Sequence, residues 1–189
     1  TAVIAAYYPE WLQLGQTSRN YLSVPEYPLN EDNTQFVLSG GYIENGDLST
    51  FRAIPHYKDE FLIKGIKESG KHAWYEDDEA LEPWVGLTRP KYTGWQEDAK
   101  YSWVKAPSFH DKVVEVGPLA YLMCALASKD KLTLKHFNAI GGLYKALTGK
   151  ELGVDDLHST LGRIIGRTVH CCTLNDILAQ QWQLLIENI

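Results

Sequence analysis

The stretch DDLHSTLGRIIGRTVHCCTLNDILAQQWQLLIE, residues 155–187, decides the fold class. Apolar side chains recur along it at the spacing of one helix face, and no proline interrupts it. We expect one helix that begins at Asp155 or Asp156, ends near Glu187 and is about 50 Å long. A helix of that length exceeds what a domain of this size covers. Two interpretations follow: an exposed amphipathic end, or a segment of a larger protein.

Two further helices are expected before this stretch. The Gly-Pro pair at 117–118 starts the first, because proline is favoured at the first helical position. That helix covers residues 119–128 and is apolar on nearly every side, which predicts burial. Thr133 is expected to cap the second helix, which Gly149 closes. Residues 115–189 should therefore form three helices.

Residues 1–112 have a different character, rich in turns and aromatic side chains. The Asn-Gly pair at 45–46, between short apolar runs, is a hairpin signal because both residues readily take positive φ. A helix is expected over residues 55–69. Residues 71–108 carry many aromatic side chains without periodicity, and so long an irregular stretch is uncommon in a compact domain. We therefore expect this stretch to wrap over another surface.

Together these features predict a mainly α fold with minor β. The expected architecture is part of a long-helix bundle with one β-hairpin and long aromatic-rich loops. Residues 1–189 would form a single central segment of a larger domain. The chain starts at Thr1 rather than at a methionine, which we take as a sign of processing or trimming.

Composition excludes several classes of protein. The 189 residues contain 18 Lys and Arg against 24 Asp and Glu, a formal net charge of −6, and no basic cluster is present. A general nucleic-acid binder is therefore not expected. The longest apolar run, residues 119–127, is half the length that spans a bilayer. Three cysteines do not make a disulfide framework.

The run His170-Cys171-Cys172 has the residue types of a metal site. On a helix, however, consecutive side chains point in directions about 100° apart and do not converge on one ion. Cys124 stands alone, and the chain contains no Cys-x-x-Cys, His-x-x-x-His or Glu-x-x-His pair. We therefore expect no metal ligand and no catalytic residue within these 189 residues.

Gly162 and Gly166 lie four residues apart inside the long expected helix, beside Arg163 and Arg167. Glycine inside a helix costs about 1 kcal/mol relative to alanine. Such a cost is tolerated where another helix crosses closely. The two arginines form a basic strip, for which an interface with an acidic partner and an ordinary core ion pair are equally good interpretations.

Three motifs carry a resemblance to a known family. They are KYSWVKAP at 100–107, EVGPLA at 115–120 and HSTLGRIIGR at 158–167. In this order they resemble the large subunit of nickel–iron hydrogenases, and the resemblance covers essentially the whole chain. The run IIGRTVHCC at 164–172 is most similar to the hydrogenase-2 type uptake enzymes of enteric bacteria. Tyr121 departs from the pattern, because many branches have arginine there.

The resemblance implies reversible heterolytic cleavage of H2 at a Ni-Fe(CO)(CN)2 centre, with magnesium in the same subunit. It implies that electrons pass to the iron–sulfur clusters of a small partner subunit and then, indirectly, to membrane electron-acceptor subunits. The family binds nickel through Cys-x-x-Cys motifs that are absent here. The chain therefore resembles the middle of a large subunit and would not be catalytic alone. Export with the small subunit to the periplasmic side of the cytoplasmic membrane is also implied.

For individual residues, the resemblance makes Glu115 a candidate acceptor of hydrogen bonds from waters around the magnesium site. The alternative for Glu115 is a carboxylate that only favours the dipole of the following helix. The resemblance places Trp103 and Lys105 on inner surfaces of the subunit. It places the helix that bears Gly162 and Arg163 in the central bundle.

Two other functions stay open at this point. One is a non-catalytic scaffold or truncated product related to the large subunits of hydrogenases and of respiratory complex I, which lost its metal ligands and kept the fold. The other is an unrelated binding module. Co-purification with an iron–sulfur subunit would favour either a hydrogenase or the related scaffold over an unrelated binding module.

Overall fold

The computed structural model describes residues 1–85 and 88–188. The chain divides into two compact units. Unit 1 combines Thr1–Pro55 with Glu115–Ile189, and unit 2 is His56–Val114. Residues that are far apart in sequence therefore build unit 1 together, whereas unit 2 is one continuous insertion within it.

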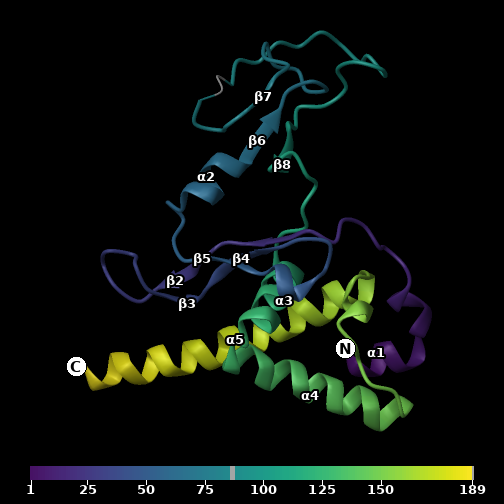
Figure 1. Ribbon diagram of the computed structural model, residues 1–189, viewed down its shortest axis with the longest axis vertical. Coiled ribbons are helices and arrows are strands. Elements are labelled where there is room, and N and C mark those ends of the chain that lie inside the picture. Colours follow the sequence, from purple (N-terminus) through teal and green to yellow (C-terminus); the bar gives the residue numbers. More distant parts are fainter. Residues whose placement is uncertain (86–87, 189) are drawn as a thin grey trace. The chain divides into compact units, whose positions relative to one another are not determined.

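Helices dominate unit 1 (Figure 1). Its four α-helices are α1 (Ala2–Tyr7), α3 (Pro118–Ser128), α4 (Lys131–Thr148) and α5 (Thr160–Glu187), and its 3-10 turns are η1 (Pro9–Leu12), η2 (Leu48–Thr50) and η3 (Asp155–Leu157). The expected three-helix order after residue 115 is present. The end of α5 at Glu187 also agrees with the sequence pattern.

Two helix starts differ from expectation. The long helix begins at Thr160, because Asp155–Leu157 form a separate 3-10 turn and the Ser159 hydroxyl accepts a hydrogen bond from the Gly162 N–H at 3.0 Å. Helix α4 is capped by Asp130, whose carboxylate accepts from the Thr133 N–H at 2.8 Å. In both cases a better side-chain acceptor stands one turn away from the residue expected to start the helix.

The core of unit 1 lies between α3 and α5. Helix α3 is buried on nearly all sides, with Leu122 and Met123 at 0% exposure. Helix α5 contributes Leu161, Ile165 and Val169, all fully buried. Burying a side chain of this size stabilises the folded chain by about 1.5–3 kcal/mol. The α3–α5 contact is therefore the main apolar support of unit 1.

Two small antiparallel sheets cover this core. Their strands are β1 (Tyr21–Ser23), β4 (Gly40–Ile43) and β5 (Arg52–Ile54) in the order β1-β4-β5, and β2 (Glu26–Pro28) with β3 (Phe36–Leu38). In the register of the first sheet Tyr21 faces Ile43, and Gly40 faces Ile54. The Asn45-Gly46 pair lies in the connection from β4 to β5 with φ of 53° and 74°, as its hairpin signal predicts.

Unit 2 is built around a third antiparallel sheet. It contains α2 (Glu60–Gly65) and the strands β6 (Ile66–Ser69), β7 (Ala80–Leu81) and β8 (Ala106–Phe109) in the order β7-β6-β8. The Lys100 ammonium donates to the carbonyls of Gly70, Ala73 and Tyr75 at 3.2, 2.8 and 3.1 Å, and to the Asp78 carboxylate at 2.6 Å. These contacts join Lys100 to residues 70–78 and so hold together parts of the aromatic stretch 71–108, which showed no periodicity in the sequence.

The expectation of a mainly α fold with one hairpin is wrong. Helices make up 42% and strands 17% of the residues, and the described strands form three separate sheets. The physical reason is strand length. Strands of two to four residues are too short to show an alternating pattern, and their partners lie far away, as when Ile66 pairs with Phe109. The fold is therefore a mixture of long helices and small sheets.

The helix expected over 55–69 is also wrong, because only Glu60–Gly65 is helical. Ile66 to Ser69 instead pair with β8. Gly65 allows the chain to pass close to β8, since a Cβ there would lie 2.4 Å from the Phe109 ring. Pairing with a distant strand thus overrides the local helix pattern.

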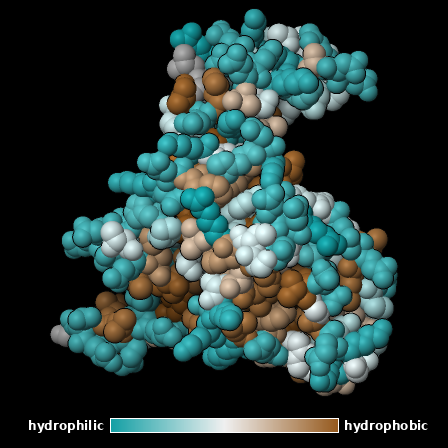
Figure 2. Space-filling view, viewed as in Figure 1, coloured by the Kyte–Doolittle hydropathy of each residue, from teal (hydrophilic) through white to brown (hydrophobic). Residues whose placement is uncertain are grey.

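Helix α5 extends beyond the core at its C-terminal end. Its exposed apolar side chains there are Leu178, Trp182, Leu184, Leu185 and Ile186. Figure 2 shows hydrophobic surface over the region of the helices. Among the described residues, no helix combines the length and the apolar character needed to cross a membrane.

Candidate functional site

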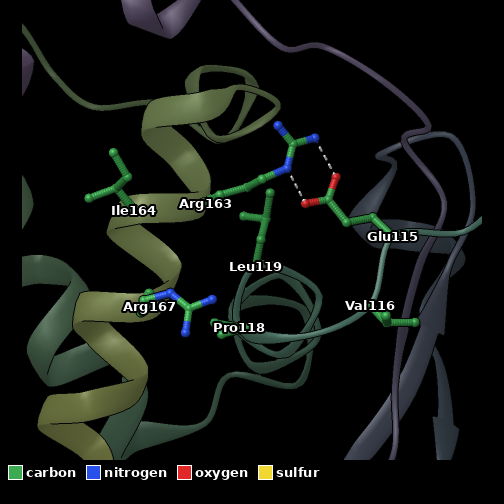
Figure 3. Close-up of a pocket in the computed structure, with 7 residues that line it drawn as sticks. All are labelled: Glu115, Val116, Pro118, Leu119, Arg163, Ile164 and Arg167. Atoms are coloured by element: carbon green, nitrogen blue, oxygen red, sulfur yellow. Dashed lines mark hydrogen bonds and ion pairs between the residues drawn. The ribbon is translucent and has the colours of Figure 1, made fainter.

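Five of the residues singled out in the sequence come together in unit 1. Glu115 directly precedes α3, and Gly162, Arg163, Gly166 and Arg167 lie on the first turns of α5. The close-up in Figure 3 shows Glu115, Arg163 and Arg167 around the first turn of α3. Trp103 and Lys105 lie in unit 2.

Glu115 and Arg163 form a two-pronged ion pair (Figure 3). Arg163 Nε donates to Glu115 Oε1 at 2.6 Å, and Nη2 donates to Oε2 at 2.8 Å. Two further guanidinium N–H groups donate to the Gly15 carbonyl at 2.8 Å and to the Thr17 hydroxyl at 2.9 Å. The hydrogen bond to Glu115 raises the pKa of Arg163. Of the two interpretations for the arginines, Arg163 takes the core ion pair.

The backbone fixes Glu115 beside the first sheet. Its N–H donates to the Asn20 carbonyl at 2.7 Å, and its carbonyl accepts from the Leu22 N–H at 3.0 Å. Only 12% of the Glu115 side chain is exposed. Because the Glu115 backbone is already fixed, little further conformational entropy is lost when its carboxylate forms the charge-assisted hydrogen bonds with Arg163.

The two glycines of α5 meet different neighbours. A Cβ at Gly166 would lie 2.9 Å from Leu119 Cα and 3.0 Å from the Pro118 carbonyl, so Gly166 is where α3 crosses closely. A Cβ at Gly162 would lie 1.9 Å from the Leu157 carbonyl, in the turn that precedes α5. The two glycines therefore allow two separate close approaches to the same helix.

Arg167 has no carboxylate partner among the residues that the structure describes. It is exposed and borders a cavity of about 170 Å³ together with Glu115, Val116, Pro118 and Arg163. In Figure 3 its guanidinium extends toward Pro118, away from the Glu115–Arg163 pair. Of the two arginines, Arg163 thus has a carboxylate partner, whereas Arg167 is exposed and has none among the described residues.

A buried pair beside this site was missed in the sequence. The Tyr21 hydroxyl lies 2.5 Å from His158 Nδ1. Tyr21 is 1% exposed and His158 is 3% exposed. Burial, followed by the charge of Glu115, raises the pKa of Tyr21 to about 12. Burial, followed by the charge of Arg19, lowers the pKa of His158. No spacing signal marks this pair, because its members lie 137 positions apart in the sequence.

Tyr121 is buried at 6% exposure in α3. Its hydroxyl lies 2.5 Å from the Thr133 hydroxyl of α4. Burial raises the pKa of Tyr121 to about 12, so the phenol stays protonated. Tyr121 thus joins α3 to α4.

The thiols do not form a ligand set. Cys124 is 1% exposed inside α3, and burial raises its pKa to about 12. Cys171 is exposed and Cys172 half-buried on α5. Among the described residues, no three His, Cys, Asp or Glu side chains are grouped so as to hold a metal ion. These residues do not fit the nickel–iron centre that the sequence resemblance implies.

Trp103 and Lys105 belong to an aromatic cluster of unit 2. The Trp103 ring lies 5.1 Å from that of Trp74 and 5.8 Å from that of Tyr92, while Trp103 remains 49% exposed. Lys105 Nζ lies 5.3 Å from the centre of the Tyr75 ring. The packed rings form a small core among the loops of unit 2, and the exposed part of the Trp103 ring leaves one open aromatic face.

Comparison with known proteins confirms the resemblance seen in the motifs. The family model described as nickel-dependent hydrogenase matches residues 1–189. The chain is 57% identical over 189 residues to the Hydrogenase-2 large chain of Escherichia coli (strain K12). This alignment covers 100% of the present chain and 33% of the Escherichia coli chain. It is 32% identical over 193 residues to the Quinone-reactive Ni/Fe-hydrogenase large chain of Wolinella succinogenes, covering 93% and 31% of the two chains.

The fold has solved neighbours as well. A structure of the Dm. baculatum [NiFeSe]-hydrogenase superposes with a TM-score of 0.70 at 23% identity, over 96% of this chain and 34% of that one. At this identity the likeness concerns the fold. The chain spans about a third of the length of the curated relatives that it matches.

Proposed function

The chain belongs to the nickel-dependent hydrogenase family, and from this premise we propose that it forms a middle segment of a hydrogenase large subunit. The complete subunit, meaning this segment with the remaining parts that its relatives have, cleaves H2 reversibly into protons and electrons. One observation carries the proposal: all 189 residues align at 57% identity with a chain named Hydrogenase-2 large chain.

The nickel ligands of the complete subunit lie outside these residues. Cys124 is sealed inside α3, and Cys171 and Cys172 are neighbours on one helix and diverge. Thiolates that bind one metal must converge on it. The residues of this segment therefore support the chemistry by holding the surrounding structure in place.

That support is built on the crossing of α3 and α5. Gly166 lets the two backbones approach, and the Glu115–Arg163 pair ties the residue before α3 to the first turn of α5. The ion pair also fixes the loop around Gly15 through the Arg163 donors. One crossing therefore positions three parts of the chain.

Glu115 has a finer role in this proposal. Both of its oxygens accept from Arg163, yet each carboxylate oxygen has a second lone pair. The cavity beside it, about 170 Å³, has room for ordered water. Glu115 would accept a hydrogen bond from water around the magnesium of the complete subunit and so act as a positioning residue.

The proposed partner is a small subunit with iron–sulfur clusters, which passes electrons on to membrane subunits. The name of the Wolinella succinogenes relative, a quinone-reactive hydrogenase large chain, supports an acceptor in the membrane. We place the complete enzyme at the periplasmic side of the cytoplasmic membrane, exported with its small subunit. The open aromatic face at Trp103, with Lys105 beside it, is assigned to an inner surface of the assembly.

Purification of the complete protein with its co-purifying subunits tests this function. We expect H2-dependent reduction of a redox dye and nickel bound to the large subunit. A complete, folded protein that holds no nickel and oxidises no H2 would overturn the proposal in favour of a scaffold that kept only the fold.

A further inference from the structure

The side chain of Lys100 ends among four oxygen atoms of unit 2, which we call the Lys100 cage. Three of them are backbone carbonyls, 3.2, 2.8 and 3.1 Å from the ammonium nitrogen, and belong to Gly70, Ala73 and Tyr75. The fourth is a carboxylate oxygen of Asp78 at 2.6 Å. The lysine side chain is only 15% exposed, so these oxygens largely replace water around the charge.

The Lys100 cage offers more acceptors than the ammonium has protons. A lysine ammonium carries three N–H donors, whereas four oxygens lie within 3.2 Å of its nitrogen. At least two of these oxygens must therefore share one proton. A spherical cation has no such limit, because it attracts every oxygen around it whatever the direction. The arrangement thus has the form of a cation site as well as that of a hydrogen-bonded lysine.

Size and charge select the kind of cation. The distances of 2.6–3.2 Å are longer than the ligand distances of about 2.3–2.6 Å for Ca²⁺ and about 2.0–2.1 Å for Mg²⁺. Backbone carbonyls are the groups that replace the hydration shell of K⁺ in selective channels. The hydrogen bond from Lys100 lowers the pKa of Asp78, so one carboxylate balances one positive charge. The cage therefore suits a monovalent cation of the size of K⁺ or ammonium.

The backbone holds much of the cage in place without the lysine. The Ala73 N–H donates to the Gly70 carbonyl at 2.9 Å, and the Tyr75 N–H donates to the Ala73 carbonyl at 2.8 Å. A Cβ at Gly70 would lie 2.0 Å from the Asp77 carbonyl, so this glycine lets the chain next to Asp78 pass close by. These backbone contacts remain when the side chain of residue 100 is shortened.

We propose that the Lys100 cage is a monovalent-cation site that the chain fills with its own ammonium group, and that K⁺ occupies it once that group is removed. The cation binds the carbonyls on both sides of Trp74, whose ring lies 5.1 Å from that of Trp103. It therefore positions the aromatic cluster of unit 2. The proposal goes beyond hydrogen oxidation and does not depend on it.

The complete subunit with Lys100→Ala tests the site. Limited proteolysis within residues 70–105 is compared in KCl and in tetramethylammonium chloride at equal ionic strength, because tetramethylammonium has the same charge but is too large for the cage. In the tetramethylammonium salt the variant should be cut about tenfold faster than the unaltered protein. In KCl most of this difference should disappear. Equal cleavage rates of the variant in the two salts would overturn the proposal.

Two controls separate ion binding from a general salt effect. The unaltered protein and Lys71→Ala, which changes an exposed lysine of the same unit, should each be cut at one rate in both salts. Lys100→Met removes the ammonium but fills the space of the lysine stem with an apolar chain. It should be cut fast in both salts, and protection of this variant by K⁺ would contradict a site within the cage.

Rubidium, a heavier ion similar in size to K⁺, locates the site directly. Crystals of the complete Lys100→Ala protein grown in rubidium chloride should show anomalous scattering among the four oxygens of the cage. An absence of rubidium there would overturn the proposal. A Lys100→Ala protein that does not fold in KCl would overturn it as well, because K⁺ is expected to replace the ammonium.

Discussion

The Tyr21 hydroxyl and Nδ1 of His158 lie 2.5 Å apart and join strand β1 to the turn before α5. The second ring nitrogen of His158, Nε2, is buried without a hydrogen-bond partner among the described residues. Asp155 lies 3.9 Å from Nε2, and its side chain is 94% exposed. A protonated His158 would thus place a charge in a buried site whose nearest carboxylate is largely solvated.

Acid should therefore destabilise unit 1. Burial and the charge of Arg19 lower the pKa of His158 below 6.5, although Asp155 and Glu115 oppose that shift. The unfolded chain takes up a proton at the ordinary pKa, whereas the folded chain resists it. The stabilisation is complete above pH 6.5 and is lost as the pH falls through the lowered pKa. Urea unfolding of the complete subunit at about pH 7.5 and about pH 5.5 measures this loss.

The matched variant is His158→Gln, which does not titrate. We expect a smaller loss of unfolding free energy on acidification than in the unaltered protein. Burial also lowers the pKa of His170, so part of the pH dependence should remain in this variant. An equal pH dependence in both proteins would remove His158 from the explanation.

The sequence predicted the helices better than the sheets. The apolar pattern of α5 extends over many turns, so its C-terminal end at Glu187 could be read directly. Strand β6 could not be read, because four residues following a helical pattern carry little signal of their own. Its pairing depends on Phe109, which lies more than forty residues further along the chain.

The site was predictable only in part. The spacing of Gly162, Arg163, Gly166 and Arg167 places all four on one stretch of helix, as observed. The pairing of Arg163 rather than Arg167 with Glu115 depends on how α3 crosses α5, which no local pattern contains. The Tyr21–His158 hydrogen bond depends on the same packing.

Gly166→Ala should destabilise the subunit. The added Cβ would lie 2.9 Å from Leu119 Cα, so backbone must shift, at a cost of about 1–3 kcal/mol. Thermal unfolding of the complete subunit measures the effect. Gly141→Ala on α4 is the control, since a Cβ there meets nothing within 4 Å and should stabilise the helix by about 0.5–1 kcal/mol. Equal shifts in melting temperature for both variants would contradict the close crossing.

The Glu115–Arg163 pair should show a measurable coupling. Glu115→Gln and Arg163→Lys each break the two-pronged geometry, and each should lower the unfolding free energy by roughly 1–2 kcal/mol. The double variant should lose less than the sum, because both changes remove the same contact. Urea unfolding of the four proteins gives the coupling energy. Strict additivity would show that the ion pair contributes nothing of its own.

Lys100→Met should loosen unit 2. The substitution leaves the carbonyls of Gly70, Ala73 and Tyr75 without their shared donor. Loss of each such bond in a partly buried place costs about 1–3 kcal/mol. Limited proteolysis should then cut within residues 70–105 much faster than in the unaltered protein.

Lys71→Met serves as the control for this variant, because Lys71 is an exposed lysine of the same unit. Its proteolysis rate should match that of the unaltered protein. If Lys100→Met is cut no faster than Lys71→Met, the ammonium does not organise these loops.

The most direct measurement is the nickel content of the complete large subunit after Cys124→Ala, Cys171→Ser and Cys172→Ser are combined. The account predicts that the triple variant keeps the nickel of the unaltered subunit, because the thiols of this segment do not converge on a metal. Loss of nickel from a triple variant that retains its melting temperature would place a metal ligand in this segment and contradict the account.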